Sequence, residues 1–178
     1  AQRAEPIPFF GELGSVNPMF LLPAATQARG TAIGTGWAAS LTMGAGQFCT
    51  NPGVAVVLDG PDADTFVDAA QEALAAVAAQ TMLTDGIAQA YRDGVGRVTA
   101  DTRVQQVLGT SCEDRSAAPY LYSVSGADWL ENASLQEEVF GPLGIVVRVA
   151  DQAEMFDIAK AIEGQLTCTI HKDPEDQE

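Results

Sequence analysis

A cysteine in a short loop of small residues is the side chain best placed for covalent chemistry. Cys49 lies within residues 46–53 (Gly-Gln-Phe-Cys-Thr-Asn-Pro-Gly), after a stretch rich in Gly, Ala and Thr and before an apolar run at 54–58. In α/β proteins, loops at the ends of sheet strands carry the chemistry. A thiolate in such a loop could attack a carbonyl carbon. The alternative is a structural cysteine, because free cysteines are among the most buried residues.

A single carboxylate stands out near the start of the chain. Glu12 lies within residues 9–18 (Phe-Phe-Gly-Glu-Leu-Gly-Ser-Val-Asn-Pro), between apolar residues and glycines. An apolar setting raises the pKa of a carboxylic acid and makes the carboxylate a better base near neutral pH. The alternative is an ordinary glutamate in a surface turn.

A third segment pairs carboxylates with an aromatic ring just before a predicted strand. Residues 135–142 read Leu-Gln-Glu-Glu-Val-Phe-Gly-Pro and include Glu138 and Phe140. A carboxylate can accept hydrogen bonds from ribose hydroxyls, and an aromatic ring can pack against a nicotinamide. The alternative is that these residues only mark the end of a helix or a turn.

Taken together and in this order, the three segments resemble the aldehyde dehydrogenase superfamily over essentially the whole chain. Glu12 lies in a match to the family's Glu-Leu-Gly-Gly motif, which carries the general base. Cys49 ends a match to its Gly-Gln-x-Cys motif, which carries the nucleophile. Glu138 and Phe140 match its Glu-x-Phe-Gly-Pro motif, which contacts the nicotinamide ribose and ring. The separation of Glu12 and Cys49 along the chain is also close to that of the family.

The resemblance implies an oxidation of an aldehyde to a carboxylic acid with NAD or NADP as cofactor. The Cys49 thiolate would form a thiohemiacetal, hydride transfer would leave a thioester, and Glu12 would activate the water that hydrolyses it. The main-chain N–H of Cys49 would help to stabilise the oxyanion. The implied cofactor-binding residues are Glu138, Phe140, Leu13 and Gly14.

Sequence variants within the motifs resemble one subgroup of the family, which oxidises α-ketoglutaric semialdehyde (2,5-dioxopentanoate). Fatty aldehyde dehydrogenases of marine bacteria are similar as well, so an aliphatic aldehyde is the alternative substrate. Ser15 departs from the family by occupying the place of the second glycine of the base motif. A hypothesis from a different class is a non-catalytic assembly module, in which Cys49 would be structural.

Two other motif matches are weaker. Residues 34–39 fit the GxGxxA dinucleotide fingerprint, with Asp59 about twenty residues further on, but that fingerprint must directly follow a strand. Residues 26–30 make a poor strand, so a closely packed helix is the better interpretation. Cys49 and His171 resemble a papain-like hydrolase pair, but His171 ends a predicted strand beside an acidic tail.

Hydrophobic periodicity predicts alternating strands and helices, and hence an α/β fold with a largely parallel sheet flanked by helices. Asp151 and Glu154 resemble a capping box at the start of the last helix. The predicted strands are 17–25 (short, with turns), 54–58, 120–124, 144–149 and 166–170, and the predicted helices are 26–45, 62–83, 87–100, 102–108 and 151–162.

Composition restricts the partners and the compartment. The net charge of −15 disfavours nucleic acid and anionic membranes as partners. Three widely spaced cysteines and one histidine argue against a disulfide framework and a metal site, and favour a reducing, cytoplasmic compartment. Cys112 and Cys168 are expected to be buried or inert. Trp37, Phe66 and Trp129 are expected in the core or an interface.

The 178 residues suit one domain, with residues 1–178 forming the cysteine-bearing catalytic domain. The chain begins without Met and stops in an acidic stretch, which we interpret as a fragment truncated at both ends. The resemblance implies a separate cofactor-binding domain that this chain lacks, and a homo-oligomeric full-length enzyme. The fragment alone is therefore expected to be inactive.

Overall fold

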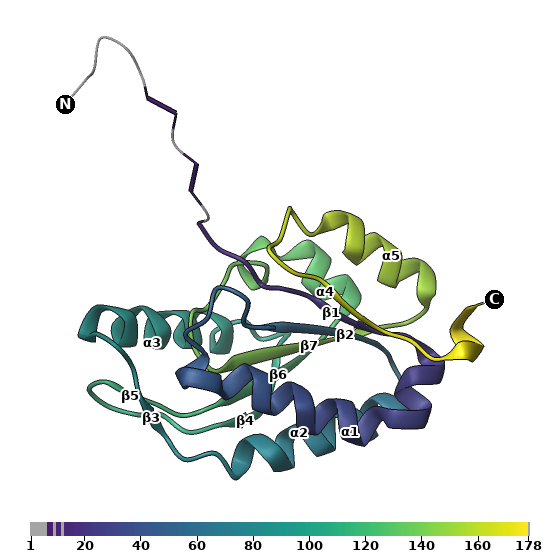
Figure 1. Cartoon of the computed structure of the whole chain (residues 1–178), viewed down its shortest axis with the longest axis horizontal. Helices are drawn as coiled ribbons and strands as arrows, with labels where there is room; N and C mark the ends of the chain where they lie inside the picture. Colours follow the sequence, from purple (N-terminus) through teal and green to yellow (C-terminus); the bar gives the residue numbers. More distant parts are fainter. Residues whose placement is uncertain (1–6, 9, 12, 178) are drawn as a thin grey trace.

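The computed structural model describes residues 7–8, 10–11 and 13–177, and these form three layers with a sheet between two sets of helices (Figure 1). The main sheet consists of β1 (Met19–Leu21), β2 (Val54–Leu58), β4 (Gln105–Gly109), β6 (Tyr120–Ser125), β7 (Leu143–Val149) and β8 (Thr169–His171). The helices are α1 (Pro23–Thr42), α2 (Pro61–Ala75), α3 (Asp85–Thr99), α4 (Gly126–Glu131) and α5 (Gln152–Ala161). Short elements are the 3-10 helices η1 (Met43–Gly46), η2 (Ala133–Leu135) and η3 (Pro174–Gln177), and the paired strands β3 (Gln80–Thr81) and β5 (Ser116–Ala117).

The strands of the main sheet follow the order β4-β6-β7-β2-β1-β8. Every neighbouring pair is parallel except β4 with β6, which is antiparallel. The prediction of an α/β fold with a largely parallel sheet is therefore confirmed. Because β2 and β7 lie in the middle and are covered on both faces, their sequences are almost entirely apolar, with Arg148 of β7 as the one charged residue.

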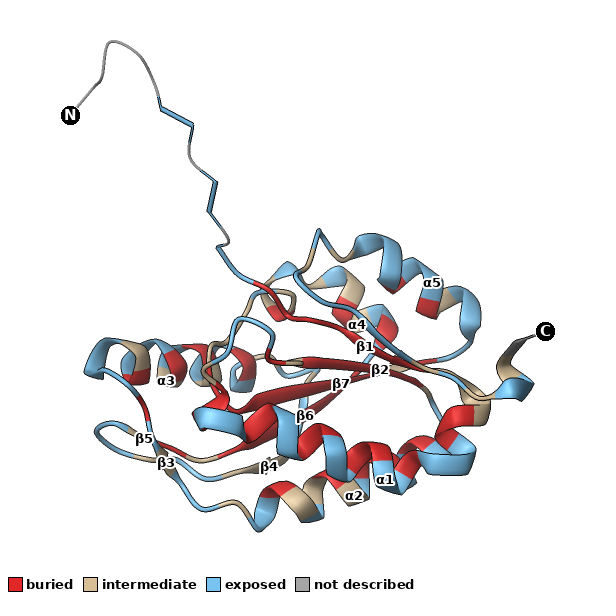
Figure 2. Ribbon diagram, in the orientation of Figure 1, coloured by how far each residue is buried: buried red, intermediate tan, exposed pale blue. Residues whose placement is uncertain are grey.

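The central strands are mostly buried (Figure 2). Their alternate residues belong to two separate hydrophobic clusters. Val54 and Val56 of β2 face the side covered by α3, α4 and α5, where Trp129 is fully buried. Ala55 and Val57 face the side covered by α1 and α2, where Trp37 stacks on Phe66. The three aromatic residues predicted in the core lie there.

Helices α1 and α2 pack closely because α1 carries small residues on the contact face. A Cβ atom at Gly34 would lie only 2.5 Å from the main-chain oxygen of Phe66. Residues 34–39 lie in the second half of α1 and do not directly follow a strand. They therefore cannot form the dinucleotide-binding fingerprint. The interpretation as a closely packed helix is confirmed.

The predicted capping box at the start of α5 is present in a shifted form, because Glu154 bonds the main-chain N–H of Ala150 rather than that of the N-cap residue Asp151. The side chain of Asp151 accepts a hydrogen bond from the Glu154 main-chain N–H at 2.9 Å. The Glu154 carboxylate reaches back to the main-chain N–H of Ala150 at 2.6 Å.

The prediction of a helix at 102–108 is wrong. Residues 105–109 form the edge strand β4 with a bulge between Gln106 and Leu108, paired with β6. The exposed glutamines carry no strong strand preference, so pairing with β6 overrides the local pattern.

Three other predicted elements differ at their ends. Helix α2 stops at Ala75 rather than at residue 83, because residues 80–81 pair with β5 and an alanine-rich pattern is only a weak helix preference. Helix α1 begins at Pro23 and stops at Thr42, where glycines allow a left-handed turn. Strand β8 is confined to Thr169–His171.

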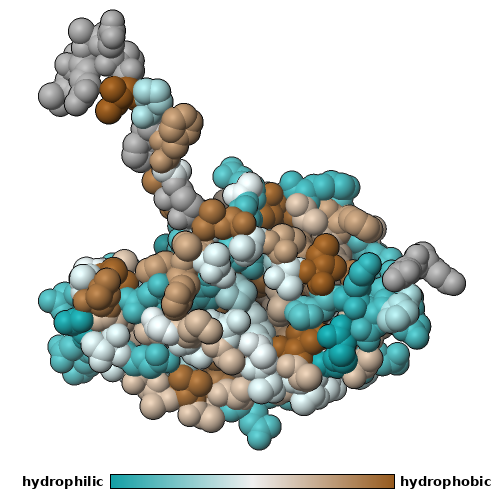
Figure 3. Space-filling view, in the orientation of Figure 1, coloured by the Kyte–Doolittle hydropathy of each residue, from teal (hydrophilic) through white to brown (hydrophobic). Residues whose placement is uncertain are grey.

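The surface in the view of Figure 3 mixes hydrophilic and hydrophobic residues. Within the described part of the chain, no helix combines the length and the apolar character needed to cross a membrane. Of the expectation that Cys112 and Cys168 are buried or inert, burial is wrong, since Cys112 is half-buried and Cys168 is exposed. That they are inert stays a prediction. Cys168 directly precedes the exposed edge strand β8, which explains its exposure.

Candidate active site

The segments singled out in the sequence converge at the amino ends of three adjacent parallel strands. Residues 13–18 lead into β1, residues 47–53 into β2 and residues 136–142 into β7. Gly53 links them, since its N–H donates to Val16 O and its carbonyl accepts from Ile145 N, both at 2.9 Å. Ligands of open α/β sheets usually bind at the carboxyl ends of the strands. This site differs, because it lies at the amino ends.

A left-handed turn delivers the chain to Cys49. Gly44, Ala45 and Gly46 have φ values of 57°, 58° and 67°. Glycine adopts this conformation readily, whereas at Ala45 it is strained. A Cβ atom at Gly46 would lie 2.3 Å from the carbonyl carbon of Gly141, so only glycine allows the two backbones to touch.

Two glutamine side chains hold this turn. Gln80 accepts a hydrogen bond from Ala45 N and donates one to Thr42 O, both at 3.0 Å. Gln47, within the Gly-Gln-Phe-Cys match, donates to Gly44 O and accepts from Leu83 N, both at 2.9 Å. The two side chains therefore attach the turn to the segment that contains β3.

Cys49 follows this turn as an exposed, free cysteine. Its main-chain oxygen accepts a hydrogen bond from Asn17 Nδ2 at 2.9 Å. Among the described residues, no acceptor takes its main-chain N–H, which leaves this donor available for an oxyanion. The Cys49 side chain is therefore exposed, while its main chain is fixed by the hydrogen bond from Asn17.

Asn17 is buried and adopts a positive φ of 46°. Asparagine tolerates the left-handed region better than most residues. Besides Cys49, its Nδ2 also donates to Asn51 O at 2.9 Å and to Ser15 O at 3.3 Å. Its Oδ1 accepts from both the N–H and the hydroxyl of Thr167.

Ser15, the departure from the family motif, is buried and serves as a hydrogen-bonding residue. Its hydroxyl lies 2.9 Å from both Asn17 Oδ1 and Gln165 Oε1, and it accepts from Leu166 N at 3.0 Å. Its φ is not positive, so the backbone there does not require glycine. Gln165 also accepts a hydrogen bond from Val16 N at 2.6 Å, which fixes residues 15–17 to the segment that precedes β8.

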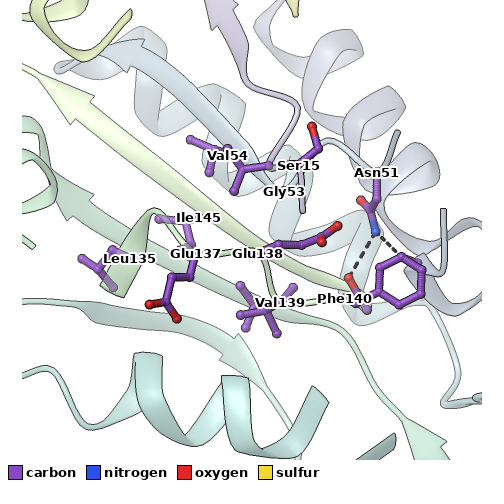
Figure 4. A pocket seen from close by; sticks show the side chains of 14 residues that line it. Ser15, Asn51, Gly53, Val54, Leu135, Glu137, Glu138, Val139, Phe140 and Ile145 are labelled. Carbon is purple, nitrogen blue, oxygen red and sulfur yellow. Dashed lines mark hydrogen bonds between the residues drawn. The ribbon is translucent and has the colours of Figure 1, made fainter. Parts of the chain in front are cut away.

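Glu138 and Phe140, both half-buried, lie on the loop before β7 and line a pocket together with Asn51 (Figure 4). A Cβ atom at Gly14 would lie 3.4 Å from the Glu138 carboxylate, so this glycine and Glu138 are in close contact. Leu13, Gly14 and Glu138 also line a neighbouring cleft of about 690 Å³. Glu12 lies outside the described residues.

The side chain of Asn51 connects the turn before Cys49 with the loop before β7. It is nine-tenths buried, and its Nδ2 donates to Gly46 O at 2.6 Å and to Gly141 O at 3.1 Å. Tyr91 supports the second loop, because its ring packs on Gly141 and its hydroxyl donates to Ala118 O at 2.8 Å. Burial, and then the neighbouring Tyr120, raise the pKa of Tyr91, so its phenol stays neutral.

The site therefore joins an accessible thiol, a carboxylate-bearing loop and the start of β1. The chain also matches, over residues 2–176, the sequence model described as "Aldehyde dehydrogenase family". The chain belongs to the aldehyde dehydrogenase family. This confirms the resemblance that the three motifs indicated.

Two curated members of the family are similar over 98% of this chain. "Alpha-ketoglutaric semialdehyde dehydrogenase 2" from Azospirillum brasilense is 45% identical, and "Alpha-ketoglutaric semialdehyde dehydrogenase" from Acinetobacter baylyi is 36% identical. In each case the match covers 34% of the relative, so the chain spans about a third of their length.

Solved structures of other dehydrogenases share the fold. An NAD-dependent benzaldehyde dehydrogenase from Corynebacterium glutamicum aligns with a TM-score of 0.74 and 19% identity over 90% of this chain and 35% of its own. An NADP-dependent glyceraldehyde-3-phosphate dehydrogenase from Bacillus halodurans aligns with a TM-score of 0.74 and 20% identity, over 93% and 35%.

The alternative pair of Cys49 and His171 is not brought together. His171 pairs with Leu21 at the carboxyl end of β1, whereas Cys49 precedes the amino end of β2. Within the described ranges, no group of three or more His, Cys, Asp or Glu side chains could hold a metal ion.

Sequence reasoning missed the amides that hold the site: Asn17, Asn51, Gln80 and Gln165. Asn17 and Asn51 each precede a proline, which marks a turn, and that pattern could have identified them. Gln80 and Gln165 lie far from the motifs along the chain, and no local pattern identifies them.

Proposed function

We propose that this chain provides the nucleophile-bearing part of an enzyme that oxidises α-ketoglutaric semialdehyde to the dicarboxylic acid with NAD or NADP. The observation that carries the proposal is the exposed Cys49 on a held loop, whose Asn51 side chain bonds to Gly141 at the end of the loop of Glu138 and Phe140. The names of the two curated relatives support the substrate.

In the proposed reaction, the Cys49 thiolate attacks the aldehyde carbon and forms a thiohemiacetal alkoxide. The Cys49 main-chain N–H would donate a hydrogen bond to the new oxyanion. Loss of hydride from this carbon, with re-formation of the C=O bond, leaves a thioester on Sγ. Attack by water then releases the carboxylic acid and returns the free thiol.

A bound nicotinamide would accept the hydride. The residues present fit such a group, because the cleft beside Glu138 has the volume of a small-molecule site. The Glu138 carboxylate would accept hydrogen bonds from ribose hydroxyls, and Phe140 would support the ring. Gly14 leaves room that a side chain at that position would take from Glu138. Leu13, which lines the cleft and is 89% exposed, would provide apolar contact.

Glu12 is proposed as the general base for thioester hydrolysis, on the family motif that contains it. Glu12→Gln keeps the shape of the side chain and removes its ability to accept a proton. In the complete enzyme, a first-turnover burst of NAD(P)H should survive while steady turnover slows by roughly 10²–10⁴-fold. Unchanged steady turnover would contradict this role.

Further proposals concern the complete protein. A separate cofactor-binding domain would complete the site, so that residues 1–178 alone would be inactive. We also propose a homo-oligomer, as the family resemblance implies, and a cytoplasmic location. The location rests on the three free cysteines, which suit a reducing compartment.

The proposed function is tested by assaying the complete enzyme and its Cys49→Ala variant at 340 nm. The substrates are α-ketoglutaric semialdehyde and straight-chain aldehydes of several lengths, each with NAD and NADP. We expect α-ketoglutaric semialdehyde to give the highest kcat/KM and Cys49→Ala to abolish turnover. Near wild-type oxidation by Cys49→Ala would exclude this nucleophile, and a folded wild-type protein inactive with every aldehyde would favour a non-catalytic assembly module.

A further inference from the structure

One side-chain amide lies between the turn that precedes Cys49 and the loop that carries Glu138 and Phe140. Asn51 Nδ2 is within hydrogen-bond distance of three main-chain oxygens: Gly46 at 2.6 Å, Gly141 at 3.1 Å and Leu41 at 3.3 Å. Figure 4 shows the Asn51 amide pointing toward the Glu138–Phe140 loop.

The two loops would repel each other at this point without a donor between them. Gly46 and Gly141 present carbonyl oxygens to the same place, and their backbones touch so closely that no side chain fits. A carbonyl oxygen only accepts hydrogen bonds, so the contact requires an N–H or O–H group from elsewhere. Asn51 supplies it.

The oxygen of the same amide has no such role. Asn51 Oδ1 is buried, and no described residue donates a hydrogen bond to it. Buried polar atoms are normally satisfied, so an asparagine here is a poor choice for stability alone. The three main-chain oxygens around Asn51 Nδ2 are a better reason for an asparagine at this position.

We infer that Asn51 is a positioning residue that sets the placement of Cys49 relative to the nicotinamide ring. It does so by tying the turn at Gly46 to the loop at Gly141. This inference rests on the proposed function, in which hydride leaves the carbon bound to Cys49 for a ring held near Glu138 and Phe140. Hydride transfer depends steeply on this geometry, whereas attack of the thiol on a small free reagent does not.

Two variants of the complete enzyme separate positioning from stability. Asn51→Asp keeps the size and the buried oxygen but places a carboxylate oxygen against three carbonyls. Asn51→Ser retains one donor and avoids the added charge. Gln71→Glu, at a half-buried position of α2, makes the same amide-to-carboxylate change away from the site and is the matched control.

The readouts are the burst rate of NAD(P)H formation, the alkylation rate of Cys49 by iodoacetamide without cofactor, and the melting temperature. We expect the burst rate to fall roughly 100-fold in Asn51→Asp. It should fall less in Asn51→Ser, and the Cys49 alkylation rate should change much less in both. Gln71→Glu should match the wild type in all three. If Asn51→Asp does not fold, Asn51→Ser alone decides.

Wild-type burst rates in the Asn51 variants would overturn the inference. A parallel fall of burst and alkylation rates would also overturn it, because that pattern shows general disorder of the turn. A folded wild-type enzyme that forms no NAD(P)H with any aldehyde would instead overturn the proposed function itself.

Discussion

The side chain of Asn17 holds the main chain of Cys49, with 2.9 Å between Asn17 Nδ2 and the Cys49 carbonyl oxygen. The residues are 32 positions apart and lie in different motifs. Asn17 is buried two residues before β1 and has a positive φ of 46°. The start of β1 and the nucleophile loop therefore form one hydrogen-bonded unit.

Asn17→Ala should destabilise the protein by about 2–4 kcal/mol, because it leaves main-chain carbonyls without donors and strains a left-handed residue. Asn17→Gly also removes the amide but relieves the strain, so about 1 kcal/mol should return. Urea unfolding of the complete enzyme measures both. Equal stability of the Ala and Gly variants would show that the backbone conformation contributes nothing.

Gly46→Ala should disrupt the contact between the nucleophile turn and the Gly141 backbone. Its Cβ would lie 2.3 Å from the Gly141 carbonyl carbon, at a φ of 67°. We expect a loss of about 2–4 kcal/mol in stability and a large fall in activity. Gly36→Ala is the control, since nothing lies within 4 Å of its Cβ and alanine favours a helix interior by up to about 1 kcal/mol. If both variants behave alike, the proposed close contact is wrong.

Gln80→Ala should loosen the left-handed turn before Cys49. It removes the acceptor for Ala45 N–H and the donor to Thr42 O, at an expected cost of about 1–3 kcal/mol. Cys49 alkylation by iodoacetamide should change with it, because the turn sets the thiol's surroundings. Thr81→Ala, an exposed neighbour on β3, should leave the alkylation rate unchanged. An unchanged rate in Gln80→Ala would show that the turn holds its shape without this side chain.

Asp101 should make stability depend on pH in the acid range. Hydrogen bonds from the side chain and main chain of Arg103 lower the pKa of Asp101 from 3.8 to about 2. Because the folded state prefers the ionised form, this contribution is full above about pH 5 and disappears as the pH falls toward 2. Asp101→Asn should therefore be less stable than the wild type near pH 6, with a difference that shrinks on acidification. A difference independent of pH down to 2 would contradict this assignment.

Much of the fold was predictable because the hydrophobic periods are clear. The buried strands at 54–58 and 144–149 and the capping box at Asp151 are local patterns, and all three are present. Strand β4 was not predictable from its residues, because its conformation depends on pairing with β6. The early end of α2 likewise depends on the pairing of Gln80 with Ala117.

The candidate site, like the fold, was predictable only in part. Cys49 and Glu138 were identified because they lie in short motifs, and their loops lie at the same edge of the sheet. Gln80 and Gln165 act over 35 residues or more along the chain, on Ala45 and Val16. Such contacts arise only from the folded arrangement, so no local pattern indicates them.

The most direct test of the account is to trap the acyl group on the enzyme. The complete Glu12→Gln variant, which should hydrolyse the thioester slowly, is mixed with NAD or NADP and α-ketoglutaric semialdehyde and quenched in acid. Peptide mass spectrometry should then find the acyl group on the Cys49 peptide, and not on those of Cys112 or Cys168. An acyl group on another residue, or none on Cys49 while NAD(P)H has formed, would contradict the central claim that Cys49 is the nucleophile.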